Sequence, residues 1–97
     1  MDLDAHQGNG TARCSALVPD LLLFDVFNSD IYPRDKAALD LTWRPLPVPM
    51  RTRTEKYLET IYQELPSALE KARPGIVFYN AGTDIFIKDP LGSNGLA

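Results

Sequence analysis

Residues 21–28, LLLFDVFN, form the stretch that decides the fold class. The run is apolar except for Asp25 until it reaches Asn28, and it has the length of a strand. A strand that is apolar on both faces is typical of a parallel sheet covered by helices on each side. The run therefore predicts an α/β domain, with partner strands and crossover helices on either side of it in the chain.

Two further segments are predicted to supply the partner strands. The first five residues, MDLDA, have the character of the C-terminal end of a strand, and residues 76–80, IVFYN, form a second apolar run after a Pro-Gly turn. Between the first two strands, a short helix is predicted for residues 11–17, ending before Pro19.

The strongest helix is predicted for residues 53–73. Its apolar side chains recur at helical spacing and are expected to form one face: Leu58, Ile61, Tyr62, Leu65, Leu69 and Ala72. Thr52 and Glu55 fit a capping box at its start. Pro66 is expected to kink or break the helix near its middle.

Residues 29–50 are predicted to be irregular, because the spacing Pro-x-Pro-x-Pro at residues 45–49 favours extended backbone over helix. The segment WRPLPVP has two interpretations, a polyproline docking segment or a loop that shields the sheet edge. The tail after Asp84 is predicted to be loop. Because three strands with their helices bury little surface, we expect the chain to be a segment of a larger domain.

Composition narrows the class of protein. The chain has 97 residues, 44% of them hydrophobic, and a net charge of -3 without a basic block, so we expect no nucleic-acid partner. No apolar run approaches the roughly 20 residues that span a bilayer, so we expect no membrane partner. The single cysteine, Cys14, is predicted to be a small buried residue, and its lack of a disulfide partner favours an intracellular location.

Polar side chains follow two of the predicted strands. Asp2, Asp4 and His6 alternate and would share one face of a strand, and Asp84 follows the strand at residues 76–80. If the two strands are neighbours, Asp4, His6 and Asp84 can meet at their carboxyl ends and bind Zn²⁺. These residues alone also fit plain turns and caps, so they predict a candidate metal site and no more.

Two motifs resemble the zinc-dependent histone deacetylase family. DLDAHQGNG at residues 2–10 is similar to its D-x-D-x-H-x-G-(D/N)-G signature, and AGTDIFIKDPLG at residues 81–92 is similar to its later G-x-D segment. DVFNSDIYPRD and YNAGTD look most like the class IV branch. The resemblance implies a three-layer arginase/deacetylase-like fold with a parallel sheet, of which residues 1–97 would form a single partial domain. It also implies removal of acyl groups from the N-acyl-lysine of a protein or small-molecule substrate.

The resemblance assigns roles to individual residues. Asp4, His6 and Asp84 would be the zinc ligands. Asp2 would accept a hydrogen bond from a catalytic His and orient it, as carboxylates behind a metal site do. Asn9 falls where many members have an Asp that supports a second His.

The family also has a monovalent-cation site around the first motif and the next strand, which implies K⁺ bound near Asp2 and Asp25, with Asp4 and His6 taking part. The family's His pair lies before the first motif, and its catalytic Tyr follows a later glycine-rich segment. This chain has one His, His6, so the isolated 97 residues are predicted to be catalytically inactive.

Two alternatives stay open. Asp2-Leu3-Asp4 also fits the start of a haloacid dehalogenase-like phosphatase, in which the first Asp is the nucleophile, the second is the acid, and the metal is Mg²⁺. That interpretation gives His6 and Asp84 no role. The other alternative is a non-catalytic, deacetylase-like binding module.

Overall fold

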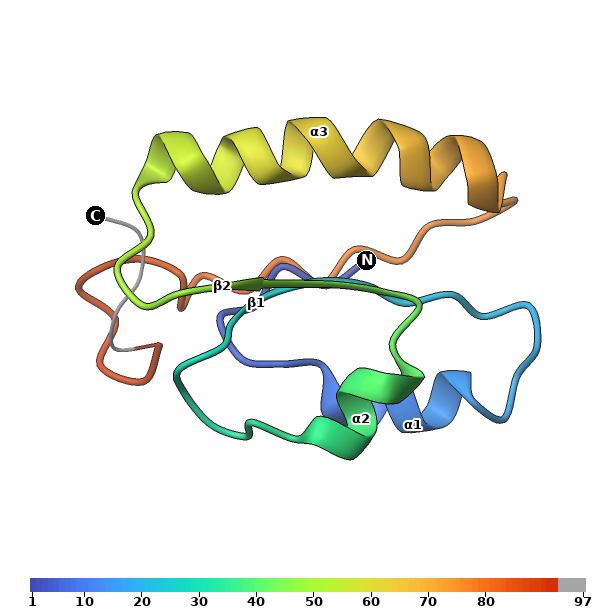
Figure 1. The fold of residues 1–97 in the computed structure, drawn as a ribbon, viewed down its shortest axis with the longest axis horizontal. Helices are drawn as coiled ribbons and strands as arrows, with labels where there is room; N and C mark the ends of the chain where they lie inside the picture. Colours follow the sequence, from blue (N-terminus) through green and yellow to red (C-terminus); the bar gives the residue numbers. More distant parts are fainter. Residues whose placement is uncertain (93–97) are drawn as a thin grey trace.

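The computed structural model describes residues 1–92, and residues 93–97 lie outside the description. Its elements in chain order are α1 (Asn9–Ser15), β1 (Phe24–Asn28), α2 (Lys36–Leu41), β2 (Arg44–Val48) and α3 (Thr54–Ala72). Helix α3 covers one face of the strands, and α1 and α2 lie on the other (Figure 1). The α/β class with parallel strands, predicted from residues 21–28, is confirmed.

The sheet is wider than its two regular strands. Strands β1 and β2 pair in parallel, with Phe24 opposite Arg44. On the other side of β1 lies the N-terminal segment, where the Asp2 N–H donates to the Phe24 carbonyl at 2.8 Å. Beyond it lies the segment that ends at Asn80, whose carbonyl accepts from the Leu3 N–H at 3.1 Å. Each of these two segments joins the sheet through a parallel bridge at Asp2 rather than through a long ladder.

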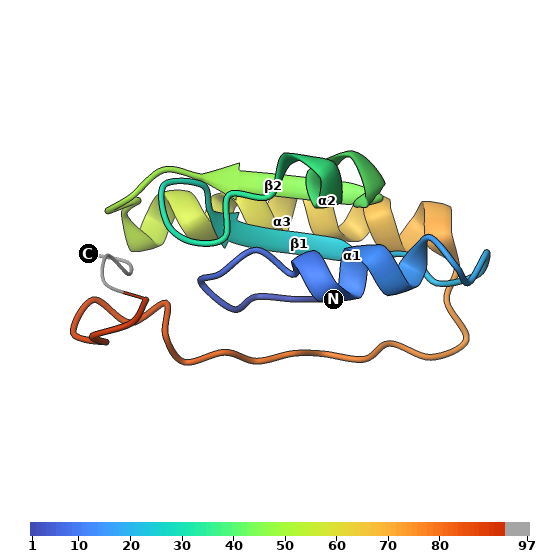
Figure 2. The same ribbon diagram turned by 90° about the horizontal axis from the view of Figure 1, so that it is seen from below.

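The four extended segments therefore lie in the spatial order β2, β1, residues 1–5, residues 78–80 (Figure 2). The first and the last segments of the chain are neighbours in the sheet. The connection from residues 1–5 to β1 runs through α1 on one face, and the connection from β2 to residues 78–80 runs through α3 on the opposite face (Figure 1). In open α/β sheets such a switch point leaves a crevice at the carboxyl ends of the strands.

The prediction that residues 29–50 are irregular is wrong, because this stretch contains α2 and β2. The Asp35 side chain caps α2 by accepting the Ala38 N–H at 3.0 Å. Two prolines are tolerated in β2 because it lies at the sheet edge. The Arg44 N–H donates inward to Leu23 O at 3.0 Å, so the alternate positions, Pro45 and Pro47, lie where a missing N–H costs no ladder bond. Residues 44–48 are thus neither a loop nor a free polyproline segment.

The other element predictions hold with corrections. The first helix begins at Asn9 and ends at Ser15, two residues earlier than predicted, and Cys14 is exposed on it rather than buried. Helix α3 matches the predicted range closely, but no side chain caps its start; the Thr52 hydroxyl donates to the Pro49 carbonyl instead. The helix also continues through Pro66 without a break.

The predicted apolar face of α3 is confirmed in part, because Ile61 and Leu65 pack against the core as predicted, but the most buried residues of the helix are others. Tyr57 and Ala68 are its buried residues, whereas Leu58, Leu69 and Tyr62 are exposed. The core between α3 and the sheet is formed by these two residues and three strand residues, Phe24, Val26 and Val48. On the opposite face, Ala12, Leu23 and Ala38 pack α1 and α2 against the chain before β1.

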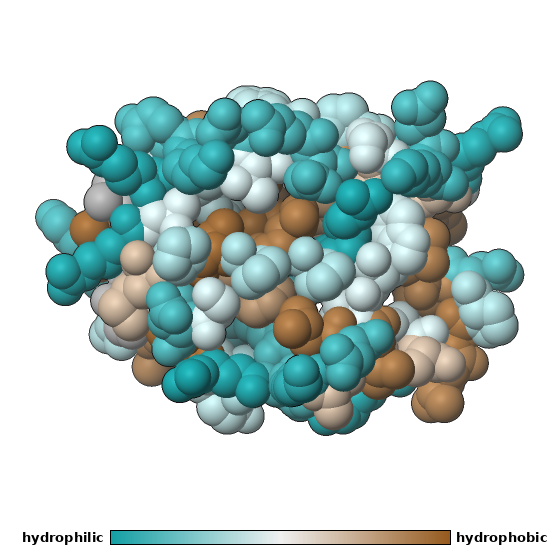
Figure 3. All heavy atoms as spheres, in the orientation of Figure 1, coloured by the Kyte–Doolittle hydropathy of each residue, from teal (hydrophilic) through white to brown (hydrophobic). Residues whose placement is uncertain are grey.

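Phe27, in the apolar run of residues 21–28, is buried, whereas Phe78, in the apolar run of residues 76–80, is 77% exposed. It is one of four consecutive exposed apolar residues, at positions 76–79, along the outermost segment of the sheet. Figure 3 shows hydrophilic residues along much of α3, with apolar residues in the middle of this face below the helix and at the end of the molecule where the helix finishes. No helix within residues 1–92 is long and apolar enough to cross a membrane.

Candidate metal centre

Asp4, His6 and Asp84 meet at the carboxyl ends of two neighbouring segments of the sheet, residues 1–5 and residues 78–80. His6 Nδ1 lies 2.7 Å from Asp84 Oδ2 and 3.2 Å from Asp4 Oδ1. One ligand atom from each of the three residues lies within 4.8 Å of the others. His6 and Asp84, which are 78 positions apart in the chain, come together because residues 1–5 and residues 78–80 are neighbours at the switch point. All three side chains are partly buried, so a bound ion would still be reached by solvent or substrate.

The backbone holds the three side chains in this arrangement. The Asp84 carboxylate accepts the Ala5 N–H through Oδ1 at 2.8 Å while its Oδ2 faces the imidazole. The Asp4 carboxylate accepts the His6 N–H at 2.8 Å. Gly82 lies against Asp4 so closely that a Cβ on it would sit 2.7 Å from the Asp4 Cα. The loop after residue 80 can approach the first segment because residue 82 has no side chain.

The electrostatics of the cluster favour a cation. Burial lowers the pKa of His6, but hydrogen bonds to Asp84 and Asp4 outweigh this and hold it above its ordinary value. The two carboxylates therefore favour a positive charge at this place. A metal ion at the same place would replace the proton on Nδ1, since a His ligand binds metal in its neutral form.

Asp2 lies behind this cluster and is buried. Its Oδ1 accepts two hydrogen bonds, from the Asp4 N–H at 3.0 Å and from the Asn80 amide at 2.9 Å. Among the described residues no hydrogen bond to its Oδ2 is formed. The second oxygen is therefore available to a further donor, such as the imidazole that the family resemblance places there.

Asp25, on β1, is fully buried and incompletely paired. Its Oδ2 accepts the Gly8 N–H at 2.9 Å, whereas its Oδ1 has no partner among residues 1–92. Burial raises the pKa of Asp25 to about 7, and the neighbouring Asp2 and Asp4 carboxylates add to the rise against the opposing effect of the Gly8 hydrogen bond. A buried carboxylate oxygen without a donor is a site that a cation or a proton must satisfy.

Two residues near the centre were not singled out by the sequence. Gln7 is buried, and both ends of its amide bind the backbone of Asp35, at 2.8 Å each. Asp35 also accepts a longer hydrogen bond, 3.4 Å, from the Asn9 amide. Asn9 thus faces Asp35 in this chain, and its support of a second His stays a prediction. No spacing rule could have found the Gln7 contact, because its partner is a backbone group 28 residues away.

The residues fit a divalent metal by the chemistry of their donors. One imidazole nitrogen and two carboxylate oxygens are the kind of three-ligand set that holds Zn²⁺ in catalytic sites, where a fourth position stays open. Mg²⁺ would be less suited, because it prefers oxygen ligands in an octahedral shell.

Comparisons with known proteins identify relatives of the whole chain. Residues 1–97 match the histone deacetylase domain family. The chain is 39% identical over 92 residues to histone deacetylase 2 of Arabidopsis thaliana, covering 95% of this chain and 24% of that protein. It is 34% identical over 92 residues to an uncharacterised protein of a Picosynechococcus species, covering 95% of this chain and 30% of that protein. The chain therefore spans about a quarter to a third of the length of these curated relatives.

Proposed function

Because the chain belongs to the histone deacetylase family, we propose that it carries the zinc-binding part of an active site that removes acyl groups from N-acyl-lysine. The observation that carries the proposal is the meeting of Asp4, His6 and Asp84, with one ligand atom of each within 4.8 Å of the others. The family-level fold, a three-layer arginase/deacetylase-like domain of which these residues form one part, and the class IV assignment belong to the same proposal. Helices on both faces of a parallel sheet are consistent with that fold.

The residues of this chain would divide the work as follows. Asp4, His6 and Asp84 hold Zn²⁺, which when bound polarises the acyl carbonyl and makes water a better nucleophile. The Asp84 carboxylate also fixes the backbone of the first motif through Ala5. Asp2, buried and anchored through Oδ1, would orient a general-base imidazole that is not among these 97 residues.

The same proposal includes a limit on the isolated chain. Its single His, His6, is used as a ligand, so no imidazole remains among the 97 residues to act as the general base. Loss of a positioned base costs about 10²–10⁴-fold in rate. The 97 residues by themselves are therefore expected to bind zinc and to hydrolyse acetyl-lysine at no measurable rate.

A second cation is part of the proposal. The unpartnered Oδ1 of buried Asp25, close enough to Asp2 for their charges to interact, supports a monovalent-cation site at Asp25. K⁺ there would neutralise a carboxylate that otherwise takes up a proton near neutral pH. Stabilisation of the chain by KCl, beyond that by an equal concentration of tetramethylammonium chloride, would support it.

The phosphatase alternative is less well supported by the geometry. It assigns work to Asp2 and Asp4 only, yet Asp2 lies behind the cluster with its Oδ1 already bound twice. The structure brings His6 and Asp84 to Asp4, and only the deacetylase interpretation uses all three.

Zinc titration of the purified chain tests the proposal. We expect one Zn²⁺ per chain, with Asp84→Ala and His6→Ala abolishing the binding and Asp40→Ala, an exposed acid on α2, leaving it unchanged. Unchanged zinc affinity in Asp84→Ala would contradict the proposed zinc site. Zinc-dependent release of acetate from acetyl-lysine by the 97 residues alone would contradict the expected inactivity.

A further inference from the structure

A buried side chain next to the zinc ligands has no role in the proposed function. Gln7 follows His6 directly and is 6% exposed. Its Nε2 donates to the Asp35 carbonyl and its Oε1 accepts the Asp35 N–H, both at 2.8 Å. Only this orientation of the amide places a donor against each acceptor. One side chain thereby pairs with a backbone position as a neighbouring strand would.

The bond belongs to a series that holds every residue from 5 to 8. Ala5 is held by Asp84, His6 by Asp4 and Gly8 by Asp25, in each case through a backbone N–H bound to a carboxylate. Gln7 alone reaches outward, to the loop of residues 29–35 that follows β1 at the same edge of the sheet. We propose that Gln7 is a positioning residue, which sets His6 against the two carboxylates by bonding its own loop to the backbone of Asp35.

The surrounding contacts argue against a purely structural role. Helices α1 and α2 are held together without Gln7, by the buried residues Ala12 and Ala38 and by the 2.6 Å ion pair between Arg13 and Asp35. Removing the Gln7 amide should therefore leave the helices in place and release the loop between His6 and α1. When Gln7 is released, the neighbouring ligand His6 can move relative to the other two ligands. Metal affinity then falls, because the ligands are no longer held in the binding geometry before the metal binds.

The metal-binding measurement rests on the proposed function. Co²⁺ is the probe, because its visible absorption spectrum depends on the geometry of its ligands. Gln7→Leu should weaken Co²⁺ binding to the 97-residue chain by about tenfold and change the Co²⁺ spectrum. Asp40→Ala, an exposed change on α2, keeps the backbone partner of Gln7 and the Asp35 side chain and should bind Co²⁺ as the parent does. Ala68→Gly, a buried change in α3 on the opposite face, provides a chain of lowered stability with an intact site.

Hydrogen exchange of the metal-free chain gives a readout that does not depend on the metal. Gln7→Leu should speed exchange of the amides of residues 5–8 and leave those of α1 and α2 unchanged. The inference is overturned by unchanged exchange at residues 5–8. It is equally overturned by parental Co²⁺ affinity in Gln7→Leu, or by an equal loss of affinity in Ala68→Gly. Failure of the parent chain to bind Co²⁺, with the exchange difference present, would count against the zinc proposal and would still support the loop-positioning role of Gln7.

Discussion

Gly82→Ala tests the close approach on which the metal centre depends. The added Cβ would lie 2.7 Å from the Asp4 Cα, 2.8 Å from its Oδ2 and 2.9 Å from its Cβ, whereas ordinary contact begins at 3.4 Å. The nearest of these atoms belongs to the backbone, so rotation of the Asp4 side chain cannot relieve the overlap. The loop that carries Asp84 must then move away from Asp4 by several tenths of an ångström.

Such a shift changes the distance between two of the three ligands, Asp4 and Asp84. We expect Gly82→Ala to cost about 1–3 kcal/mol in stability, which is typical of overpacking, and to weaken Zn²⁺ binding by about 10–100-fold. The assay is competition for Zn²⁺ with a chromogenic chelator, together with thermal unfolding of the metal-free chain. Gly75→Ala is the matched control, because its Cβ would meet nothing within 4 Å. Parental zinc affinity in Gly82→Ala, or an equal loss in Gly75→Ala, would refute the reasoning.

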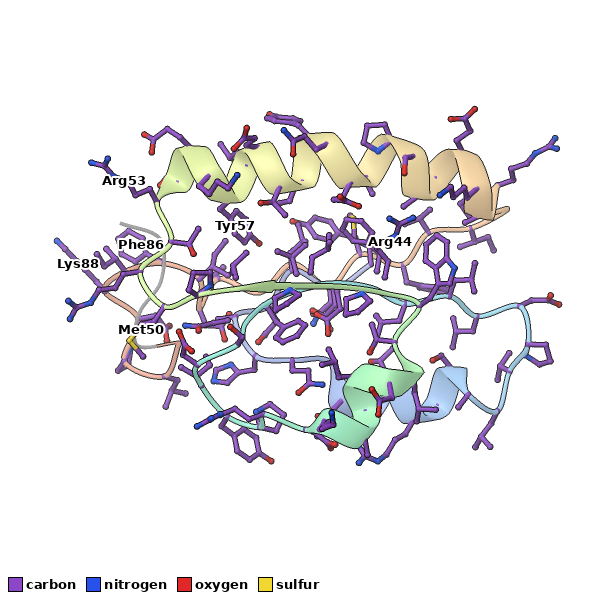
Figure 4. All side chains as sticks on the ribbon, viewed as in Figure 1. Arg44, Met50, Arg53, Tyr57, Phe86 and Lys88 are labelled. Atoms are coloured by element: carbon purple, nitrogen blue, oxygen red, sulfur yellow. The ribbon has the colours of Figure 1, made fainter. Side chains whose placement is uncertain are left out.

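Three further changes test other parts of the structure. Tyr57, which points from α3 toward the sheet (Figure 4), has a buried hydroxyl without a partner among residues 1–92, and burial raises its pKa to about 12. The unsubstituted chain should therefore lose up to about 3 kcal/mol of stability as the pH rises from 10 to 12, whereas Tyr57→Phe should not. Urea unfolding measures the free energy of unfolding of both chains, and an equal loss in the two would contradict this expectation. The Arg13 guanidinium, with the Ala38 N–H, lowers the pKa of Asp35 from 3.8 to about 2, so the stability that this carboxylate provides is present above pH 3.8 and is lost as the pH falls through 2. In Asp35→Asn the melting temperature should depend less on pH over that range than in the unsubstituted chain. The same dependence of the melting temperature on pH in both chains would exclude the ion pair as a source of acid sensitivity. Pro66→Ala should stabilise the chain by about 1–3 kcal/mol, because α3 already runs through this exposed position and Ala restores the missing N–H; an unchanged melting temperature would show that the proline costs nothing here.

The local sequence pattern was enough to predict part of the fold. The apolar run that contains β1, the helical spacing over residues 54–72 and the polar residues after the first and last segments each depend on neighbours in the sequence. Hydrophobic periodicity is the main signal of secondary structure, and these segments show it clearly. The sequence pattern was misleading where the position of a segment in the tertiary structure matters more than its residue types. Pro45 and Pro47 argue against a strand until it is known that β2 lies at the sheet edge with their nitrogens turned outward.

The sequence placed Ile61 and Leu65 correctly on the core side of α3, but it did not identify the most buried residues of the helix or the exposure of Cys14. Leu69 is 41% exposed while Tyr57 is 4% exposed, although both carry large apolar side chains on the same helix. Helical spacing gives the relative angle of side chains but not which angle faces the sheet. That choice is made by the sheet residues that pack against the helix, such as Phe24 and Val26.

The sequence by itself determined the chemical groups available to this protein: two motifs with acidic residues and one His, an α/β alternation of elements, and a parallel arrangement of strands. Only the tertiary structure decided that the first and last segments are neighbours, and hence that Asp84 lies 2.7 Å from an imidazole 78 residues away. It also decided the approach of Gly82 to Asp4 and the bonding of Gln7 to Asp35. The physical reason is that hydrogen bonding and steric contact act over a few ångströms in space, whatever the separation along the chain.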